Sequence, residues 1–178
     1  ASDKTGTLTQ NRMTVQHCWY DKQVFRAPAA RNSTHYKEVM GLEYAGEKVY
    51  DPKSPTFQKL QMVTTLCNNA NFLLTKDEKV INLQKEMNNP NFNLLSLSCT
   101  GDASESGLIK FVQPIGDINA MRAANEKIFE IKFNSTNKWQ LSIHKTDAKP
   151  VCVLKGAPER VLQKCKYMMV NGKLQKIT

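Results

Sequence analysis

Residues 128–155 indicate the fold class most directly, and they read IFEIKFNSTNKWQLSIHKTDAKPVCVLK. Three stretches within them are rich in the β-branched and aromatic residues that favour strands: Ile128 to Phe133, Trp139 to His144 and Val151 to Lys155. The polar turn Asn134 to Asn137 joins the first two stretches. Because short connections join antiparallel neighbours, this part of the chain predicts an antiparallel sheet.

Helices and further hairpins are predicted on both sides of this sheet. The predicted helices begin at Pro55, run from Ala103 to Val112 and from Asp117 to Glu126, and extend from Pro158 to about Cys165, with a shorter helical piece between Val80 and Met87. The predicted hairpins turn at Asp21-Lys22 and at Asn171-Gly172. Strands and helices do not alternate strictly, so the expected fold class is α+β, a mostly antiparallel sheet flanked by helices.

Length and charge limit the class of protein. The chain has 178 residues, enough for one domain or for one domain with a fragment of another. Its net charge is +9, from 25 basic and 16 acidic residues, and the lysines are spread along the chain. A polyanionic ligand such as a nucleotide explains part of this charge. The sequence shows no zinc-finger spacing, aromatic RNA-binding motif or basic repeat, so no nucleic-acid partner is expected.

The remaining composition excludes several other classes. Five cysteines without a CxxC pair favour reduced thiols in the cytosol over a disulfide framework. No apolar run approaches the ~20 residues that cross a bilayer, and no signal peptide is seen, so the polypeptide is expected to be soluble. The scattered histidines lack metal-ligand spacing. Neither GxxxxGK(S/T) nor GxGxxG occurs, so a Walker-type phosphate loop is excluded.

A phosphate-directed string lies near the first residue: DKTGTLT, residues 3–9. The carboxylate of Asp3 can act as a nucleophile and carry a phosphoryl group as an acyl phosphate. Lys4 offers a positive charge to phosphate oxygens, and Gly6 lets the backbone come close to them. A lone Asp-Lys-Thr-Gly is most often a solvated polar turn. The full string, however, resembles the phosphorylation signature of P-type ion-pumping ATPases.

Five further blocks resemble the alpha subunits of Na,K-ATPase and H,K-ATPase, in the order of that family. They are QNRMTV (10–15), GDASES (101–106), FNSTNK (133–138), QLSIHK (140–145) and KGAPER (155–160). The resemblance implies that residues 1–12 are a fragment of the phosphorylation domain. It implies that residues 13–178 form the nucleotide-binding domain, incomplete at its C-terminus. Ala27 to Thr56 matches poorly and is expected to be a lineage-specific surface insertion.

The resemblance implies that Asp3 is the phosphoryl acceptor, which attacks the γ-phosphate of ATP in the presence of Mg²⁺. Lys4 and Thr5 would complete the catalytic string, and Asp3 and Thr5 would hold Mg²⁺ only in a complete phosphorylation domain. In the related haloacid-dehalogenase-type phosphatases a second Asp stands at the position of Thr5. Threonine cannot act as a general acid or base at neutral pH, so an acyl phosphate on Asp3 should be long-lived, as a pump requires.

For the nucleotide, the resemblance implies an adenosine pocket. The equivalent of Phe133 in the family stacks on adenine, an interaction worth about 1–3 kcal/mol. Lys138 would lie beside the ring, and Gln140 can bond an adenine edge or the ribose. Lys155 would reach the deep end of the pocket or a phosphate, and Gly156 permits close approach of the backbone.

One acidic residue joins this predicted pocket. The family match implies that Glu105 accepts a hydrogen bond from the adenine 6-amino group, in the first turn of a helix that Asp102 caps. A structural role competes with this interpretation, because a carboxylate in the first turn is also favoured by the helix dipole. Without the resemblance, Phe133 would be assigned to the core and Lys155 to either the surface or a site.

The implied parent is a multi-pass, ATP-hydrolysing cation pump, with this segment on the cytoplasmic face of the membrane. Its cofactors are ATP and Mg²⁺. Its partners are ATP or ADP, the remaining phosphorylation, actuator and transmembrane domains, and a beta subunit. The isolated chain is expected to bind ATP weakly and ADP nearly as well, and to form no phosphoenzyme.

Two alternatives remain open from the sequence. The parent could be another P-type cation pump, such as a Ca²⁺ transporter, which the FNSTNK and GDASES blocks disfavour. The isolated chain could instead act as a nucleotide-sensing or protein-docking module without catalysis. Perturbation of Glu105, Phe133, Lys138 and Lys155 by ATP would favour the pump.

Overall fold

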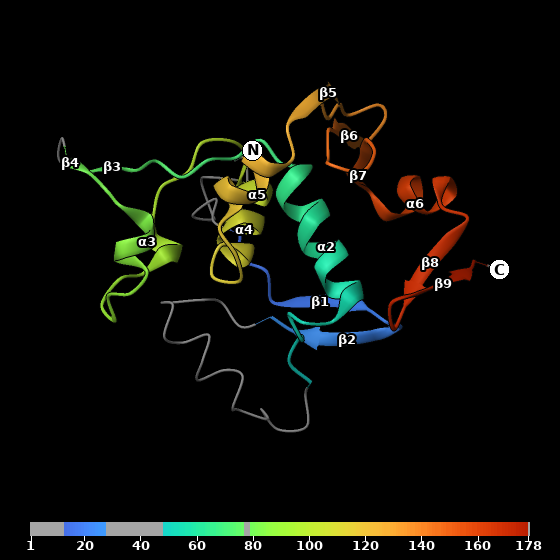
Figure 1. Ribbon diagram of the computed structural model, residues 1–178, viewed down its shortest axis with the longest axis horizontal. Helices are drawn as coiled ribbons and strands as arrows, with labels where there is room; N and C mark the ends of the chain where they lie inside the picture. The colour runs from blue at the N-terminus through green and yellow to red at the C-terminus, as the bar shows by residue number, and fades with distance from the viewer. Residues whose placement is uncertain (1–12, 28–47, 77–78, 178) are drawn as a thin grey trace, which may run out of the picture.

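A computed structural model describes residues 13–27, 48–76 and 79–177 (Figure 1). Its helices are α2 (Pro55–Leu66), α3 (Leu83–Glu86), α4 (Ala103–Val112), α5 (Ile118–Ala124) and α6 (Pro158–Val161), with 3-10 turns at Leu94–Ser96 and Leu162–Lys164. Its strands are β1 (His17–Tyr20), β2 (Gln23–Arg26), β3 (Thr75–Lys76), β4 (Lys79–Val80), β5 (Lys127–Ile131), β6 (Trp139–His144), β7 (Val151–Gly156), β8 (Tyr167–Val170) and β9 (Lys173–Lys176).

The three-stranded sheet predicted from residues 128–155 is present, with strand order β5-β6-β7 and antiparallel pairing. Along the central strand β6, buried and half-buried residues alternate, as expected for a sheet with one covered face. Gln140, Ser142 and His144 lie on the covered face. The Sγ atom of Cys67 donates to the carbonyl of Gln140 at 3.5 Å, and Ser142 Oγ donates to the carbonyl of Leu66 at 3.4 Å. The covered face therefore lies on the C-terminal end of α2.

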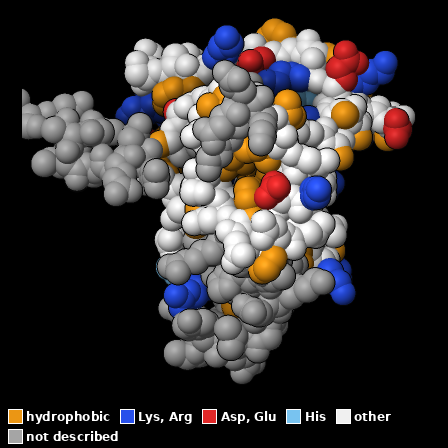
Figure 2. Space-filling view, turned by 90° about the vertical axis from the view of Figure 1, so that its left-hand side faces the viewer, with side chains coloured by type: hydrophobic (Ala, Val, Ile, Leu, Met, Phe, Trp, Pro, Cys, Tyr) orange, Lys and Arg blue, Asp and Glu red, His pale blue; other side chains and the backbone are white. Residues whose placement is uncertain are grey.

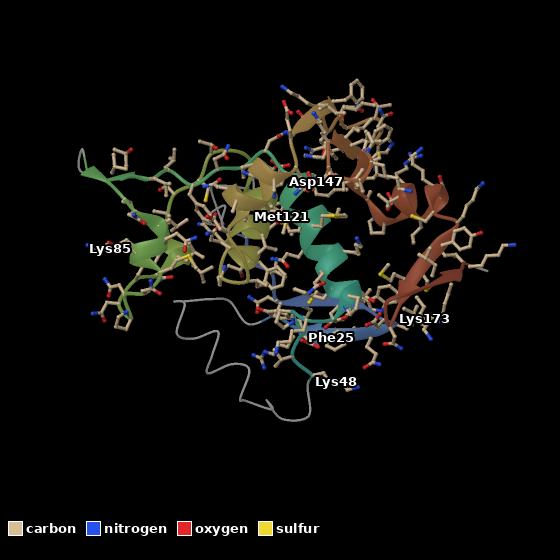
Figure 3. All side chains as sticks on the ribbon, in the orientation of Figure 1. Phe25, Lys48, Lys85, Met121, Asp147 and Lys173 are labelled. Carbon is tan, nitrogen blue, oxygen red and sulfur yellow. The ribbon has the colours of Figure 1, made fainter. Side chains whose placement is uncertain are left out.

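Helix α2 runs through the middle of the molecule, from the two hairpins β1–β2 and β8–β9 to the sheet (Figure 1). It begins at Pro55, as predicted, and the side chain of Ser54 caps it by accepting from the N–H of Phe57 at 3.4 Å. Phe57 is fully buried and stacks on Tyr50, with ring centroids 4.8 Å apart. At the other end of α2, Met121 of α5 packs against the cluster that includes Leu66 and Val153 (Figure 3).

The two hairpins meet through their turns. Asp21, Lys22, Asn171 and Gly172 all have positive φ, between 49° and 74°, as a type I′ turn requires. The N–H of Asn171 donates to Oδ1 of Asp21 at 2.6 Å, and the N–H of Gly172 donates to Oγ1 of Thr56 at 3.0 Å. These bonds fix both hairpins beside the first turn of α2.

Helix α4 is the element that carries the predicted acidic residue of the site. Asp102 is its N-cap, as predicted, because Oδ1 of Asp102 accepts from the N–H of Glu105 at 2.8 Å. Both α4 and α5 contact α2. Ile109 and Val112 of α4 and Ile118 of α5 are buried in one apolar cluster, which fixes the orientation of α4.

The α+β class and its antiparallel pairing are confirmed, with two differences in detail. The described strands form four small antiparallel sheets, and the β3–β4 pair was not predicted because two-residue strands show no alternation. The helix expected between Val80 and Met87 begins only at Leu83, where the side chain of Asn82 caps it. Most of the expected insertion from Ala27 to Thr56 lies outside the described residues.

Two surface properties bear on the class of protein. Every helix in the described ranges falls short of the length and apolarity that crossing a membrane demands. On the face drawn in Figure 2, basic and acidic side chains are interspersed among the coloured residues, without one continuous basic patch. On this face, the described residues therefore offer no broad basic surface to a long polyanion.

Candidate functional site

The structure brings two of the predicted nucleotide-binding residues into direct contact. Nζ of Lys155, near the end of β7, lies 2.7 Å from Oε1 of Glu105, in the first turn of α4. The side chain of Glu105 is 7% exposed and that of Lys155 is 26% exposed. A carboxylate this deeply buried requires a charged or hydrogen-bonding partner. The ion pair therefore connects the end of the sheet to the start of α4.

The second oxygen of Glu105 is held by the segment that follows α2. Oε2 of Glu105 accepts from the N–H of Asn69 at 3.2 Å. The side chain of Asn69 continues this network, because its Nδ2 donates to Oε1 of Glu130 at 2.6 Å and its Oδ1 accepts from Nζ of Lys127 at 2.6 Å. Nζ of Lys127 also lies 3.2 Å from Oε1 of Glu130. One asparagine thus links two carboxylates that come from different elements.

Glu130 accepts hydrogen bonds from three side chains of this network, those of Asn69, Lys127 and Gln140. Burial raises the pKa of its carboxyl group, but the hydrogen bonds from Asn69 and Lys127, the positive charge of Lys127 and the hydrogen bond from Gln140 lower it. The net result is a pKa below the ordinary value of 4.5. Glu130 is therefore ionised at neutral pH and accepts hydrogen bonds only.

Gln140 is fixed within the same network. It pairs with Lys155 across β6 and β7, so both side chains lie on the covered face of the sheet. Its Nε2 donates to Oε1 of Glu130 at 3.1 Å, and the residue is 4% exposed. Its direct bond to an adenine edge or a ribose stays a prediction. The contact in the structure is with Glu130.

Phe133 and Lys138 belong to the loop between β5 and β6. Phe133 is 59% exposed, so its ring is available to a flat ligand. Lys138 is also exposed, with φ of 59°, and its N–H donates to the carbonyl of Asn134 at 2.8 Å. Because Trp139 pairs with Gly156, this loop and the end of β7 lie at the same end of the sheet. That is also the end at which Lys155 meets α4.

Gly156 is required by a close approach within the protein. A Cβ at this position would lie 2.5 Å from the carbonyl oxygen of Lys138 and 2.6 Å from Cα of Trp139. The N–H of Ala157 donates to that same carbonyl at 2.8 Å. The absence of a side chain therefore allows β7 to close tightly on the start of β6, a reason that differs from the expected approach to a ligand.

Two cavities among the described residues lie beside the candidate site. A cavity of about 220 Å³ is lined in part by Asn69 and Lys127, and so adjoins the network. A larger one, of about 530 Å³, borders other side chains of α4. Neither is lined by Phe133, Glu105 or Lys155. These two cavities therefore do not enclose the candidate site.

The predicted phosphorylation residues are not part of this geometry. Asp3, Lys4 and Thr5 lie outside the described residues. Within 13–27, 48–76 and 79–177, no three His, Cys, Asp or Glu side chains gather closely enough to hold a metal ion. The assignment of Mg²⁺ to Asp3 and Thr5 stays a prediction.

Sequence reasoning missed four residues of the site: Asn69, Arg122, Lys127 and Glu130. Glu130 carried one signal, since it is an acidic residue inside an apolar strand. The Asn68-Asn69 pair just after a predicted helix was a second signal, because such residues often bond to neighbouring backbone groups. Their partners are distant in sequence, so no local pattern could have identified the contacts.

Comparison with known proteins identifies the family of the chain. The family model described as P-type ATPase, cytoplasmic domain N, matches residues 56–178, which include all the described residues of the candidate site. The chain therefore belongs to the P-type ATPases, and its residues 56–178 match their cytoplasmic domain N.

Individual relatives support this assignment over almost the full chain. Potassium-transporting ATPase alpha chain 2 of Rattus norvegicus is 42% identical over 179 residues, which cover 98% of this chain and 15% of the relative. Sodium/potassium-transporting ATPase subunit alpha of Drosophila melanogaster is 42% identical over 177 residues, covering 97% of this chain and 15% of the relative. The chain thus spans about 15% of the length of these curated relatives.

Proposed function

We propose that this chain is the ATP-binding domain of a cation pump of the Na⁺/K⁺ or H⁺/K⁺ type. In the complete protein, ATP hydrolysis through an aspartyl phosphate on Asp3 would drive ion transport. The observation that supports the proposal best is the contact between Glu105 and Lys155 at the end of the sheet that also carries the exposed ring of Phe133. This arrangement offers an aromatic face, a cation and an acceptor within one region.

Each of these groups suits one part of adenosine. The exposed ring of Phe133 would stack on the purine. A carboxylate has about four acceptor positions, so Glu105 can accept from the adenine 6-amino group while it keeps its bonds to Lys155 and Asn69. The free N–H directions of the Lys155 ammonium would then face the ligand, since an ammonium has three donors. Lys138 would supply a further positive charge beside the ring.

The phosphates would be held elsewhere. We assign residues 1–12 to the phosphorylation domain and residues 13–178 to the nucleotide-binding domain. The γ-phosphoryl group of ATP would be transferred to the Asp3 carboxylate, and ADP would leave, only in the complete protein on the cytoplasmic face of the membrane. Lys4 would lie beside the phosphate, and Asp3 and Thr5 would hold Mg²⁺. The partners of this domain would then be the rest of the phosphorylation domain, the actuator and transmembrane domains, and a beta subunit.

An NMR titration of the 178-residue chain with ATP tests the proposal. We expect perturbed amide resonances at Glu105, Phe133, Lys138 and Lys155. The dissociation constant should be sub-millimolar to millimolar, about −4 to −5 kcal/mol, because only the adenosine end is bound. ADP should bind nearly as tightly. A micromolar affinity that depends on Mg²⁺ would reveal a self-contained phosphate site and would contradict the proposal. The absence of any response to ATP would also contradict it.

Two exposed aromatic residues allow a matched comparison. Phe133→Ala should weaken ATP binding about tenfold, the loss of one base–aromatic stack. Tyr167 in β8 is similarly exposed, at 57%, but lies on the β8–β9 hairpin. Tyr167→Ala should therefore leave the affinity unchanged. Equal effects of the two substitutions would argue against a stacking role for Phe133.

A further inference from the structure

The side chain of Arg122 donates four hydrogen bonds, all to the segment that ends α2 and follows it. It lies in α5 and is half-buried beneath the segment that follows α2. Its Nε donates to the carbonyl of Thr65 at 3.2 Å, and its Nη2 donates to the carbonyl of Asn68 at 3.0 Å. Its Nη1 donates both to the carbonyl of Ala70 at 3.0 Å and to Oδ1 of Asn71 at 2.9 Å. All three guanidinium nitrogens are thus bound to a single stretch of chain.

This stretch needs external donors because its backbone is irregular. Helix α2 ends at Leu66, so the last carbonyls of the helix and those of residues 67–71 lack partners within the helix. A buried carbonyl without a partner costs about 1–3 kcal/mol. The planar fork of Arg122 satisfies three of these carbonyls at once, which a lysine ammonium cannot reproduce with the same geometry.

The segment held by Arg122 is also the one that holds Glu105. Nδ2 of Asn68 donates to the carbonyl of Glu105 at 3.1 Å, and the N–H of Asn69 donates to Oε2 of Glu105 at 3.2 Å. The side chain of Asn69 then reaches Glu130. Burial lowers the pKa of Arg122 and the charge of Glu105 raises it, so the two groups interact through charge as well. The hydrogen bonds of Arg122 within the described residues go to the segment, and it is the segment that bonds to Glu105.

We propose that Arg122 is a positioning residue of the nucleotide site: by clamping residues 68–71 it aims the N–H of Asn69 at Glu105 and thereby fixes the carboxylate that accepts from the ligand. The inference rests on the proposed function. It predicts that Arg122 affects ATP affinity only through Glu105 and not through the aromatic part of the site.

The first test compares variants of the 178-residue chain. Arg122→Gln should weaken ATP binding about tenfold, which is typical of coupled contacts, and should increase hydrogen exchange at the amide of Asn69 in the ligand-free chain. Arg122→Lys keeps the charge but loses the fork, so it should recover only part of the affinity. Lys85→Gln removes the same charge from α3, on the far side of the molecule from the sheet (Figure 3), and should change neither property.

A double-mutant cycle separates positioning from a general loss of structure. In a Glu105→Gln background, Arg122→Gln should have almost no further effect on ATP affinity, because the carboxylate that it positions is gone. In a Phe133→Ala background, its full tenfold effect should remain. A folding defect would instead lower the affinity in both backgrounds. If Arg122→Gln does not fold, Arg122→Lys is used in the same cycle.

The outcomes distinguish the two proposals. A wild-type chain that does not respond to ATP overturns the proposed function and this inference with it. A wild-type chain that binds ATP, with an unchanged affinity in Arg122→Gln or with equal penalties in both backgrounds, overturns the role of Arg122 alone. Unchanged hydrogen exchange at Asn69 also overturns it, whatever the affinity for ATP.

Discussion

At the scale of single residues, the candidate site is built from groups that are already hydrogen-bonded to one another before any ligand arrives. Glu105 receives Lys155 on one oxygen and Asn69 on the other. Burial makes these partners necessary, since an unpaired carboxylate at 7% exposure would cost several kcal/mol. The site is consequently preorganised, and the ligand adds a bond to an existing arrangement rather than creating it.

Gly156 should not tolerate a side chain. The Cβ of Gly156→Ala would meet backbone atoms of Lys138 and Trp139 at 2.5–2.6 Å, and such crowding costs about 1–3 kcal/mol. Urea unfolding of the variant measures this loss. Gly116→Ala is the control, because its Cβ would meet only the mobile amide end of Gln61, at 3.2 Å. Equal stability of the two variants would contradict the close packing of β7 on β6.

Glu130 should make the free energy of unfolding decrease as the pH falls into the acid range. Its pKa in the folded state is lower than the ordinary 4.5, so its stabilising contribution is complete above that value and is lost as the pH falls through the folded-state pKa. Urea unfolding between neutral pH and about pH 3 should therefore show a smaller loss of stability for Glu130→Gln than for the wild type.

The exposed Glu159 of α6 provides the control for this pH dependence. Glu159→Gln should follow the wild-type curve. Parallel curves for the wild type and Glu130→Gln would mean that the bonds from Asn69 and Lys127 do not favour the ionised carboxyl group.

At the scale of elements, local patterns predicted most of the helices and strands. Capping residues and prolines marked the starts of α2, α4 and α6, and turn residues marked both large hairpins. Residues 75–80 escaped prediction because strands of two residues are stabilised by their tertiary setting rather than by their own pattern.

The site was predicted less completely than the elements that carry it. Glu105 and Lys155 came from the family resemblance, and the structure places them in contact across 50 positions of sequence. Asn69, Arg122 and Lys127 form hydrogen bonds with residues that are distant in sequence and that packing brings close. No periodicity or spacing encodes such bonds, so a single sequence could not reveal these three residues.

The cap of α4 connects the stability of an element to the site. Asp102→Ala removes the acceptor for the N–H of Glu105 and should cost about 1 kcal/mol in urea unfolding. It should also weaken ATP binding, because Glu105 lies in the turn that loosens. Ser54→Ala removes the equivalent cap of α2, far from the sheet, and should lower stability without changing ATP affinity. Loss of affinity in both variants would indicate a general effect of destabilisation.

At the scale of the whole molecule, our proposal is that this chain binds the nucleotide and that a second domain completes the site of phosphoryl transfer. The residues that we propose for adenosine lie at the end of the β5-β6-β7 sheet. This division fits a domain that presents the nucleotide to another domain.

The isolated chain should therefore form no phosphoenzyme. Incubation with γ-labelled ATP and Mg²⁺ should leave Asp3 without acid-stable label, since the rest of the proposed phosphorylation domain is needed for transfer. A parallel sample of a complete relative, which does contain that domain, serves as the positive control. Acid-stable label on Asp3 of the 178-residue chain would show that it carries out transfer alone.

The most direct test of the account is the position of the purine on the chain, measured by isotope-filtered NOEs between unlabelled ATP and the ¹³C,¹⁵N-labelled protein. We predict NOEs from adenine H2 and H8 to the ring of Phe133 and to the side chain of Lys155. NOEs to the side chains of the 530 Å³ cavity, such as Met13 or Lys110, with none to Phe133, would contradict an adenosine site at the end of the β5-β6-β7 sheet.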